Sequence, residues 1–273
     1  MSNTYNIYLI SDSTGETIDR IFMAIKAQFL NFNYEIFQFS FTRTESQIKT
    51  ILDKARKDTQ PIILYTIVNN KLEQYLCKES KIRNIPCFGV LGDLIVNFSK
   101  IINEEATHKP SAQHVLDEEY YDRIEAIQFT MNHDDGNQTN DIEKSDIILL
   151  GVSRTSKTPT SIYLANRGFK TSNIPLVDKN SIPPKITEKN FKGCVVGLIT
   201  EPQRLHDIRR NRLNSLKENS GIDYTDLETI KKEILNSKKI FQKNSWPVID
   251  VTRKSVEETA ASIIKIYEIK NRK

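Results

Sequence analysis

The residues best suited to chemistry lie in one stretch, GVSRTSKTPTSIYLANRG at 151–168. An apolar run at 147–150 precedes it and a helical pattern follows the first eight residues. Strand, tight loop ending in Lys-Thr, and helix is the order of a phosphate-binding P-loop. Backbone N–H groups of such a loop converge on an anion, which the helix dipole also favours. The sequence therefore predicts that a nucleotide's phosphates bind to Gly151, Val152, Ser153, Arg154, Thr155, Ser156, Lys157 and Thr158.

Two side chains at the end of this loop have predicted roles. Lys157 would reach the terminal phosphates, and the Thr158 hydroxyl would hold Mg²⁺. Ser156 departs from the pattern G-x-x-x-x-G-K-[ST], because it replaces the second Gly and Ser tolerates positive φ poorly. The loop must keep φ negative there or accept strain. An ordinary βα turn rich in Ser and Thr is the alternative interpretation.

A second candidate group is the turn His133-Asp134-Asp135-Gly136, which precedes the loop in sequence. Two adjacent carboxylates beside a histidine could supply a general base or help to bind Mg²⁺. A solvated turn is the alternative, because Asp and Gly are common in turns. The residues alone favour the turn.

Other charged residues follow the loop. Asp178 and Glu201 each end a predicted strand and could act as a Walker-B-like carboxylate, or simply begin a helix. Four arginines share one predicted helix, where they could contact phosphate or a partner. The alternative is a solvated basic face. These arginines are Arg204, Arg209, Arg210 and Arg212.

The polar loop SDSTGET at 11–17 follows the first predicted strand. The carboxyl end of a parallel strand is where open α/β sheets bind ligands. The alternative is a plain helix start, with Ser13 and Glu16 as a capping box. The residues alone favour the helix start.

Strands and helices alternate along the chain, which indicates βαβ units and parallel sheets. We expect an α/β fold with an N-terminal parallel-sheet domain at 1–105, a helical connecting segment at 106–144 and a P-loop kinase-like domain at 145–273. Predicted strands lie at 5–10, 34–41, 61–68, 85–91, 147–150, 174–177, 194–199 and 246–251.

Composition restricts the class of protein. The chain has 273 residues, a formal net charge of +4, 38% hydrophobic and 27% charged residues, which is typical of a folded globular protein. No apolar run approaches the ~20 residues of a membrane span, and the N-terminus lacks a basic n-region. Three scattered cysteines suit neither a disulfide framework nor a zinc site. We therefore expect a cytoplasmic protein with no nucleic-acid or membrane partner; homodimerisation is left open.

Four stretches together resemble one family, the bifunctional regulatory proteins of pyruvate, phosphate dikinase and of phosphoenolpyruvate synthase. The resemblance runs nearly end to end, and its loop form is more similar to the dikinase-regulator branch. The loop of this family has Ser or Gly where Ser156 stands. The stretches are ISDSTGET at 10–17, HVLDEEYYDRIEAIQFTMNHDDG at 114–136, GVSRTSKTPTSIYLANRG at 151–168 and RLHDIRRNRL at 204–213.

The resemblance implies an ADP-dependent serine/threonine kinase that phosphorylates an active-site Thr of the dikinase and so inactivates it. It also implies reversal by inorganic phosphate, with release of pyrophosphate. In that chemistry Lys157 and Arg154 would spread the charge of the transferred group. The base for the target hydroxyl would be His133, Asp134 or Asp135.

Two other functions remain open at this point. The loop alone would also suit an ATP-dependent small-molecule kinase, or a regulator that binds nucleotide without catalysis. The nucleotide that donates phosphate, and the acceptor that receives it, separate these alternatives.

Overall fold

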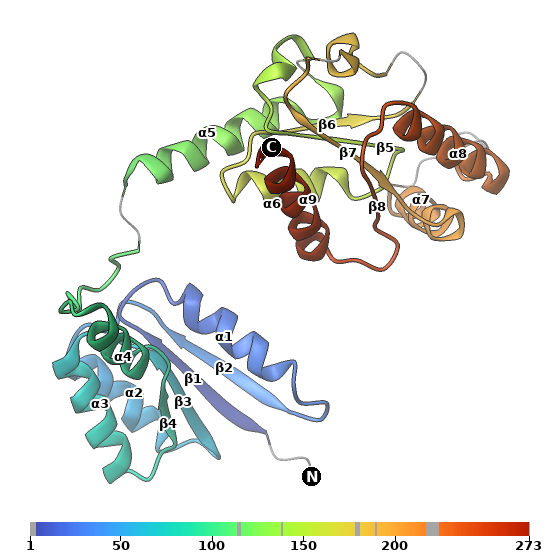
Figure 1. The fold of residues 1–273 in the computed structure, drawn as a ribbon. Coiled ribbons are helices and arrows are strands. Elements are labelled where there is room, and N and C mark those ends of the chain that lie inside the picture. The colour runs from blue at the N-terminus through green and yellow to red at the C-terminus, as the bar shows by residue number, and fades with distance from the viewer. Residues whose placement is uncertain are drawn as a thin grey trace. The chain divides into compact units, whose positions relative to one another are not determined.

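The chain forms two compact units, residues 1–115 and 116–273 (Figure 1). The computed structural model describes residues 4–113, 116–137, 139–177, 181–188, 190–216 and 224–272. The boundary between the two units follows residue 115, which lies inside the connecting segment expected at 106–144. Its helix, α5 (Glu118–Asn132), belongs to the C-terminal unit rather than to a separate part of the chain.

The N-terminal unit is built on a four-stranded parallel sheet of order β2-β1-β3-β4. Each strand is followed by a helix, as the alternating pattern predicts. The strands are β1 (Tyr5–Ser11), β2 (Tyr34–Phe39), β3 (Pro61–Thr66) and β4 (Cys87–Gly89), and the helices are α1 (Glu16–Lys26), α2 (Glu45–Ala55), α3 (Asn70–Ile82) and α4 (Gly92–Ile102).

Both faces of this sheet are covered, because successive side chains of a strand point to opposite faces. Tyr8 and Ile10 of β1 pack with residues of α2 and α3. Ile7 and Leu9 pack with Ile18 and Phe22 of α1 on the other face. The first strand, β1, is therefore buried between β2 and β3. Its carboxyl end is followed by the loop that leads to α1.

The C-terminal unit repeats this strand order, as β6-β5-β7-β8. Its sheet is also parallel and covered on both faces, by α6 and α9 on one side and by α8 on the other (Figure 1). The strands are β5 (Ile147–Gly151), β6 (Thr171–Pro175), β7 (Cys194–Ile199) and β8 (Val248–Asp250), and the helices after α5 are α6 (Lys157–Ala165), α7 (Pro202–Leu216), α8 (Leu227–Lys243) and α9 (Val256–Asn271).

The α/β class is as predicted, and the loop 151–158 joins the first strand of this second sheet, β5, to α6. Short 3₁₀ segments surround the sheet at Asp134–Gly136, Thr139–Lys144 and Pro184–Thr187. No helix in the described part of the chain is long and apolar enough to cross a membrane.

Two local predictions are wrong. The strand expected at 174–177 begins three residues earlier, at Thr171. The sequence did not show this start, because the buried triplet at 171–173 is polar and carries no apolar signal. The capping box of Ser13 and Glu16 does not form. Gly15 is the N-cap of α1 instead, with φ of 89° and no side-chain hydrogen bond to the first turn.

Helix α4 is unusual because none of its residues is buried. Its apolar residues instead remain in contact with solvent, and they include Leu94, Val96, Phe98, Ile101 and Ile102.

Candidate functional site

The loop 151–158 joins β5 to α6 in a conformation that requires a glycine at its start. A Cβ on Gly151 would lie 2.6 Å from the Leu198 carbonyl oxygen of β7 and 2.7 Å from the Thr155 hydroxyl. Inside the loop, that hydroxyl donates to the Val152 carbonyl at 3.0 Å. The loop is thus packed tightly against the neighbouring strand, which fixes where its N–H groups point.

The strain anticipated at Ser156 is present. Ser156 is the N-cap of α6 at φ of 58°, and Arg154 is also left-handed, at φ of 70°. Neither is a glycine, so both pay the steric cost of this region. Strain of this kind persists only where the surroundings determine it, and it is common at ligand sites.

Lys157 lies under the loop rather than in solvent. Its side chain is 5% exposed, and its ammonium group donates to the Val152 carbonyl at 3.0 Å. Burial lowers the pKa of Lys157 to about 8, although Asp135 and Asp134 act in the opposite direction. The cation predicted for the terminal phosphates is therefore directed at the loop itself in this structure.

Thr158 and Asp134 are brought together, as a shared site would require. The Thr158 hydroxyl donates to the two carboxylate oxygens of Asp134 at 3.1 and 3.3 Å. Asn173 of β6 donates through its side-chain amide to both residues, at 3.0 Å to the Thr158 hydroxyl. The turn after α5 is thus attached to the loop 151–158 by the side chains of Asp134, Thr158 and Asn173.

Asp135 faces a cavity of about 270 Å³ beside the loop. The loop supplies most of the cavity wall, and the remainder comes from β6 and α7. The lining residues are Asp135, Ser153, Arg154, Ser156, Lys157, Thr158, Pro159, Pro175 and Ile208.

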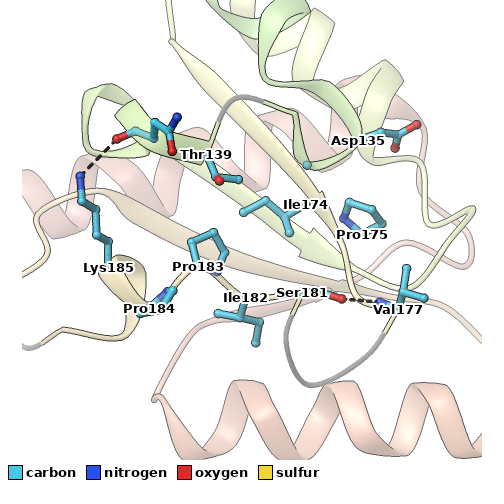
Figure 2. A pocket seen from close by; sticks show the side chains of 12 residues that line it. Asp135, Thr139, Ile174, Pro175, Val177, Ser181, Ile182, Pro183, Pro184 and Lys185 are labelled. Carbon is cyan, nitrogen blue, oxygen red and sulfur yellow. Dashed lines mark hydrogen bonds between the residues drawn. The ribbon is translucent and has the colours of Figure 1, made fainter.

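A second cavity of about 640 Å³ shares Asp135 and Pro175 with the first. In Figure 2, Asp135 and Pro175 lie at one end of this cavity and Lys185 at the other. Ile174, Ile182 and Pro183 form an apolar wall between them, and the Lys185 ammonium group donates to the Asn140 carbonyl at 3.2 Å. Asp135 is thus an exposed carboxylate at the junction of two chambers.

The structure does not support His133 as a base. Its side chain is 3% exposed, Nδ1 lies 2.7 Å from the Phe129 carbonyl and Nε2 lies 2.8 Å from Asp141. Both ring nitrogens are occupied, and the hydrogen bond from His133 keeps the pKa of Asp141 below its usual range. The His133 carbonyl accepts from the Asn173 N–H at 3.1 Å, so the residue positions the turn on β6.

Arg209 is not the surface cation that the basic helix predicted. It is 1% exposed and donates to Glu233 at 2.7 Å, to the Tyr224 carbonyl at 3.1 Å and to the Ser153 carbonyl at 3.4 Å. Arg209 therefore supports the loop 151–158 from the protein interior, through its hydrogen bond to the Ser153 carbonyl. Arg204, Arg210 and Arg212 are exposed, as a solvated basic face would be.

Of the two Walker-B candidates, only Glu201 lies in the described part of the chain. Asp178 lies outside the described residues. Glu201 is exposed, its N–H donates to the Thr252 hydroxyl at 2.9 Å, and it is absent from the described lining of the loop cavity.

Comparison with known proteins assigns the chain to a family. The profile of the kinase/pyrophosphorylase family matches residues 7–264. The chain belongs to this family. Among curated relatives, a protein of Pelagibacter ubique is 64% identical over 98% of both chains, and one of Sphingopyxis alaskensis is 46% identical over 96% of this chain and 97% of its own. Both are named putative pyruvate, phosphate dikinase regulatory proteins.

A relative from Bradyrhizobium diazoefficiens with the same name is 39% identical over 99% of this chain and 97% of its own. Among solved structures, a solute binding protein from Agrobacterium vitis gives a TM-score of 0.27 at 12% identity, covering 100% of this chain and 91% of that one. A likeness this weak carries no argument about this kinase/pyrophosphorylase.

Thr158 and Asp134 have the donor chemistry that Mg²⁺ requires in a kinase-like site. Mg²⁺ takes oxygen ligands at 2.0–2.1 Å in an octahedron, so adjacent ligand oxygens lie about 3 Å apart. The 3.1 Å between the Thr158 hydroxyl and one Asp134 oxygen matches that spacing. These two residues would hold the ion, which would neutralise charge on the phosphates.

The sequence did not reveal Asn173. It is fully buried, and its side-chain oxygen has no hydrogen-bond partner although its amide nitrogen has two. The available signal was the polar triplet Thr171-Ser172-Asn173 beside an apolar run. A strand that buries three polar residues must satisfy them, which makes such a triplet a candidate site.

Proposed function

We propose that this kinase/pyrophosphorylase phosphorylates a threonine of pyruvate, phosphate dikinase with ADP as donor, and removes that phosphate with inorganic phosphate as acceptor. The choice of the dikinase as protein substrate is supported by the relatives, which are named putative pyruvate, phosphate dikinase regulatory proteins. The observation that supports the chemistry is the hydrogen bond from Thr158 to Asp134, which places a carboxylate against the end of a strained P-loop.

In the forward direction the target hydroxyl oxygen attacks the β-phosphorus of ADP. The bond from that phosphorus to the bridging oxygen breaks, AMP leaves, and the hydroxyl proton passes to a base. Asp135 is the base in our proposal, because it is exposed at the wall of both chambers. Asp134 is engaged by Thr158 and Asn173, which suits holding the metal and orienting the loop.

In the reverse direction an oxygen of inorganic phosphate attacks the phosphorus of phosphothreonine. Pyrophosphate forms, and the threonine oxygen regains a proton from the same carboxyl group. Arg154 supplies an exposed cation on the loop for the incoming anion. Because ADP and phosphate would occupy one anion site, we expect them to compete.

The donor nucleotide decides between this function and its alternatives. Purified chain and pyruvate, phosphate dikinase are incubated with Mg²⁺ and ADP labelled in the β-phosphate, or with ATP labelled in the γ-phosphate. We expect label on a dikinase threonine from ADP alone. Transfer from ATP to a small molecule would replace this proposal with a metabolite kinase, and nucleotide binding without transfer would leave only a binding regulator.

The reverse reaction has its own assay. Labelled phosphodikinase is chased with unlabelled phosphate, and we expect the label in pyrophosphate. Label released as inorganic phosphate would instead mean hydrolysis, and the shared-site mechanism would be wrong. Lys157→Ala should abolish both directions, whereas Lys231→Ala, an exposed lysine on α8 outside the described cavity lining, should affect neither.

A further inference from the structure

The N-terminal unit contains a loop built like the P-loop. Both units order their strands as second, first, third, fourth, so in each the chain leaves the first strand where the sheet connections diverge. Such a switch point is where open α/β sheets bind ligands. Gly15 is the N-cap of α1 and Ser156 is the N-cap of α6. Both residues have left-handed backbone conformation, and neither helix has a side-chain hydrogen bond at its N-cap.

A cavity of about 210 Å³ lies at this switch point. That is roughly seven times the ~30 Å³ share of one water molecule, so the cavity is large enough for a small molecule. Hydroxyl groups dominate the lining, from the ends of β1 and β3, the start of α1 and the segment 109–113. The polar lining residues are Ser11, Asp12, Ser13, Thr14, Thr17, Thr66, Lys109, Ser111 and Gln113.

Thr66 indicates that the cavity is a binding site rather than a packing defect. Its side chain is only 5% exposed and lines the cavity, and its hydroxyl has no hydrogen-bond partner among the described residues. This hydroxyl is not among the fully buried side-chain atoms that lack a partner, so it is open to the cavity. A ligand atom that enters the cavity can therefore pair with it.

The charges around the cavity define the ligand. Lys109 lines it, exposed, and forms no ion pair with a described residue. Arg43 donates to the Asp12 carbonyl at 2.9 Å and to the Ser111 hydroxyl at 3.1 Å, which places a second cation at the rim. These cations and the uncapped N-terminus of α1 favour a phosphate group.

Asp12 restricts the ligand further. It is 2% exposed, and one carboxylate oxygen accepts from the Val68 N–H at 2.8 Å. A buried carboxylate disfavours a bare anion and favours a hydroxyl donor. A ligand with hydroxyl groups at one end and a phosphate at the other satisfies both sets of residues.

We propose that the N-terminal unit binds a small hydroxylated phosphate ester in this cavity. The phosphate lies on the first turn of α1, with Lys109 beside it, and the hydroxyl groups meet Asp12 and Thr66. This site is separate from the P-loop and does not depend on the function proposed for it.

The test follows backbone amide resonances of the intact protein by NMR during titration with ribose 5-phosphate and, separately, with inorganic phosphate. We expect saturable shifts at Gly15, Glu16 and Thr17, at least tenfold tighter for the ester than for phosphate. No shift at these amides would overturn the site, and equal affinity for the two probes would overturn the ligand class.

Variants separate this site from the P-loop. Thr66→Val removes the unpartnered hydroxyl while keeping shape, so the melting temperature should not fall, but ester affinity should drop at least tenfold. Thr50→Val on the outside of α2 is the matched control and should leave affinity unchanged. Lys157→Ala should also leave it unchanged. Undiminished binding by a folded Thr66→Val protein would refute the role of Thr66.

Discussion

Lys157 is held by its own loop, and this has a consequence for proton balance. Its pKa is about 8, below its usual value, because the group is buried. Bound phosphates would favour the charged ammonium and raise this pKa. Binding of ADP should therefore take up about half a proton at pH 8 and close to one proton at pH 9, but much less at pH 7, where the group is already charged.

Calorimetry measures this uptake. ADP is titrated at pH 8.5 in two buffers of different ionisation enthalpy, and the difference in apparent heat gives the protons bound. Lys157→Met should remove the buffer dependence, whereas Lys231→Met should retain it. If heats at pH 8.5 are independent of buffer in the native protein, Lys157 does not contact the phosphates.

The two aspartates of the turn should differ in what they contribute. Asp135→Asn should slow phosphoryl transfer by roughly 10²–10⁴-fold, the usual value of a general base, with little change in ADP affinity. Asp134→Asn should instead raise the Mg²⁺ concentration needed for half-maximal rate, because it disturbs the pair with Thr158.

Initial rates across Mg²⁺ concentrations separate these effects. Asp122→Asn, an exposed carboxylate on α5, is the matched control and should behave as the native protein. A loss below about threefold for both Asp134→Asn and Asp135→Asn would return the turn to a structural role.

At the scale of elements, the loop 151–158 holds two non-glycine residues, Arg154 and Ser156, in the strained left-handed region. Left-handed backbone costs an ordinary residue about 1–2 kcal/mol, and a glycine loses about 0.5–1 kcal/mol through chain entropy. Ser156→Gly should therefore stabilise the protein slightly, by roughly 0.5 kcal/mol, and keep ADP binding. Ser156→Val should destabilise it, because a β-branched residue fits this region worst.

Chemical denaturation followed by tryptophan fluorescence measures both changes, since Trp246 packs against the C-terminal core. A stability of Ser156→Val equal to that of the native protein would mean that the loop does not hold its left-handed turn in solution.

Helices and strands were predictable from the sequence where their buried residues are apolar and recur at the spacing of a helix or a strand. The strand from Ile147 to Leu150 is an example, and the structure confirms it. The start of β6 was not predictable, because Thr171, Ser172 and Asn173 are buried for their hydrogen bonds rather than for hydrophobicity.

The candidate site shows the same division. The loop sequence locates Lys157 and Thr158 through local spacing alone. Which carboxylate meets Thr158, however, depends on how the turn after α5 packs on β6, a contact between residues 24 apart in sequence. A different long-range contact, from Arg209 of α7 to Glu233 of α8, turns Arg209 inward, which no local charge pattern indicates.

At the scale of the whole molecule, each unit has its own core. Leu149 of β5 is fully buried in a cluster whose members all come from residues 147–267. Leu149→Ala should lower the free energy of unfolding by about 2–5 kcal/mol. Hydrogen exchange should accelerate in peptides of 116–273 and stay unchanged in those of 1–115.

The reciprocal variant is Ile63→Ala, in a buried cluster confined to residues 8–87 of the N-terminal unit. It should accelerate exchange in 1–115 alone. Faster exchange in both units from either variant would show that the two cores unfold together.

The buried ammonium group of Lys157 also makes this protein accessible to covalent chemistry. At pH 8 about half of a group with a pKa near 8 is the free amine, against about 0.4% of an ordinary lysine. A neutral amine is a nucleophile, yet this one is shielded from bulk solvent. Ordinary acylating reagents should therefore reach mainly the surface lysines and react with them slowly, because those lysines are almost entirely charged at pH 8. An acyl phosphate shaped like a nucleotide should instead enter the loop 151–158 and label Lys157 first.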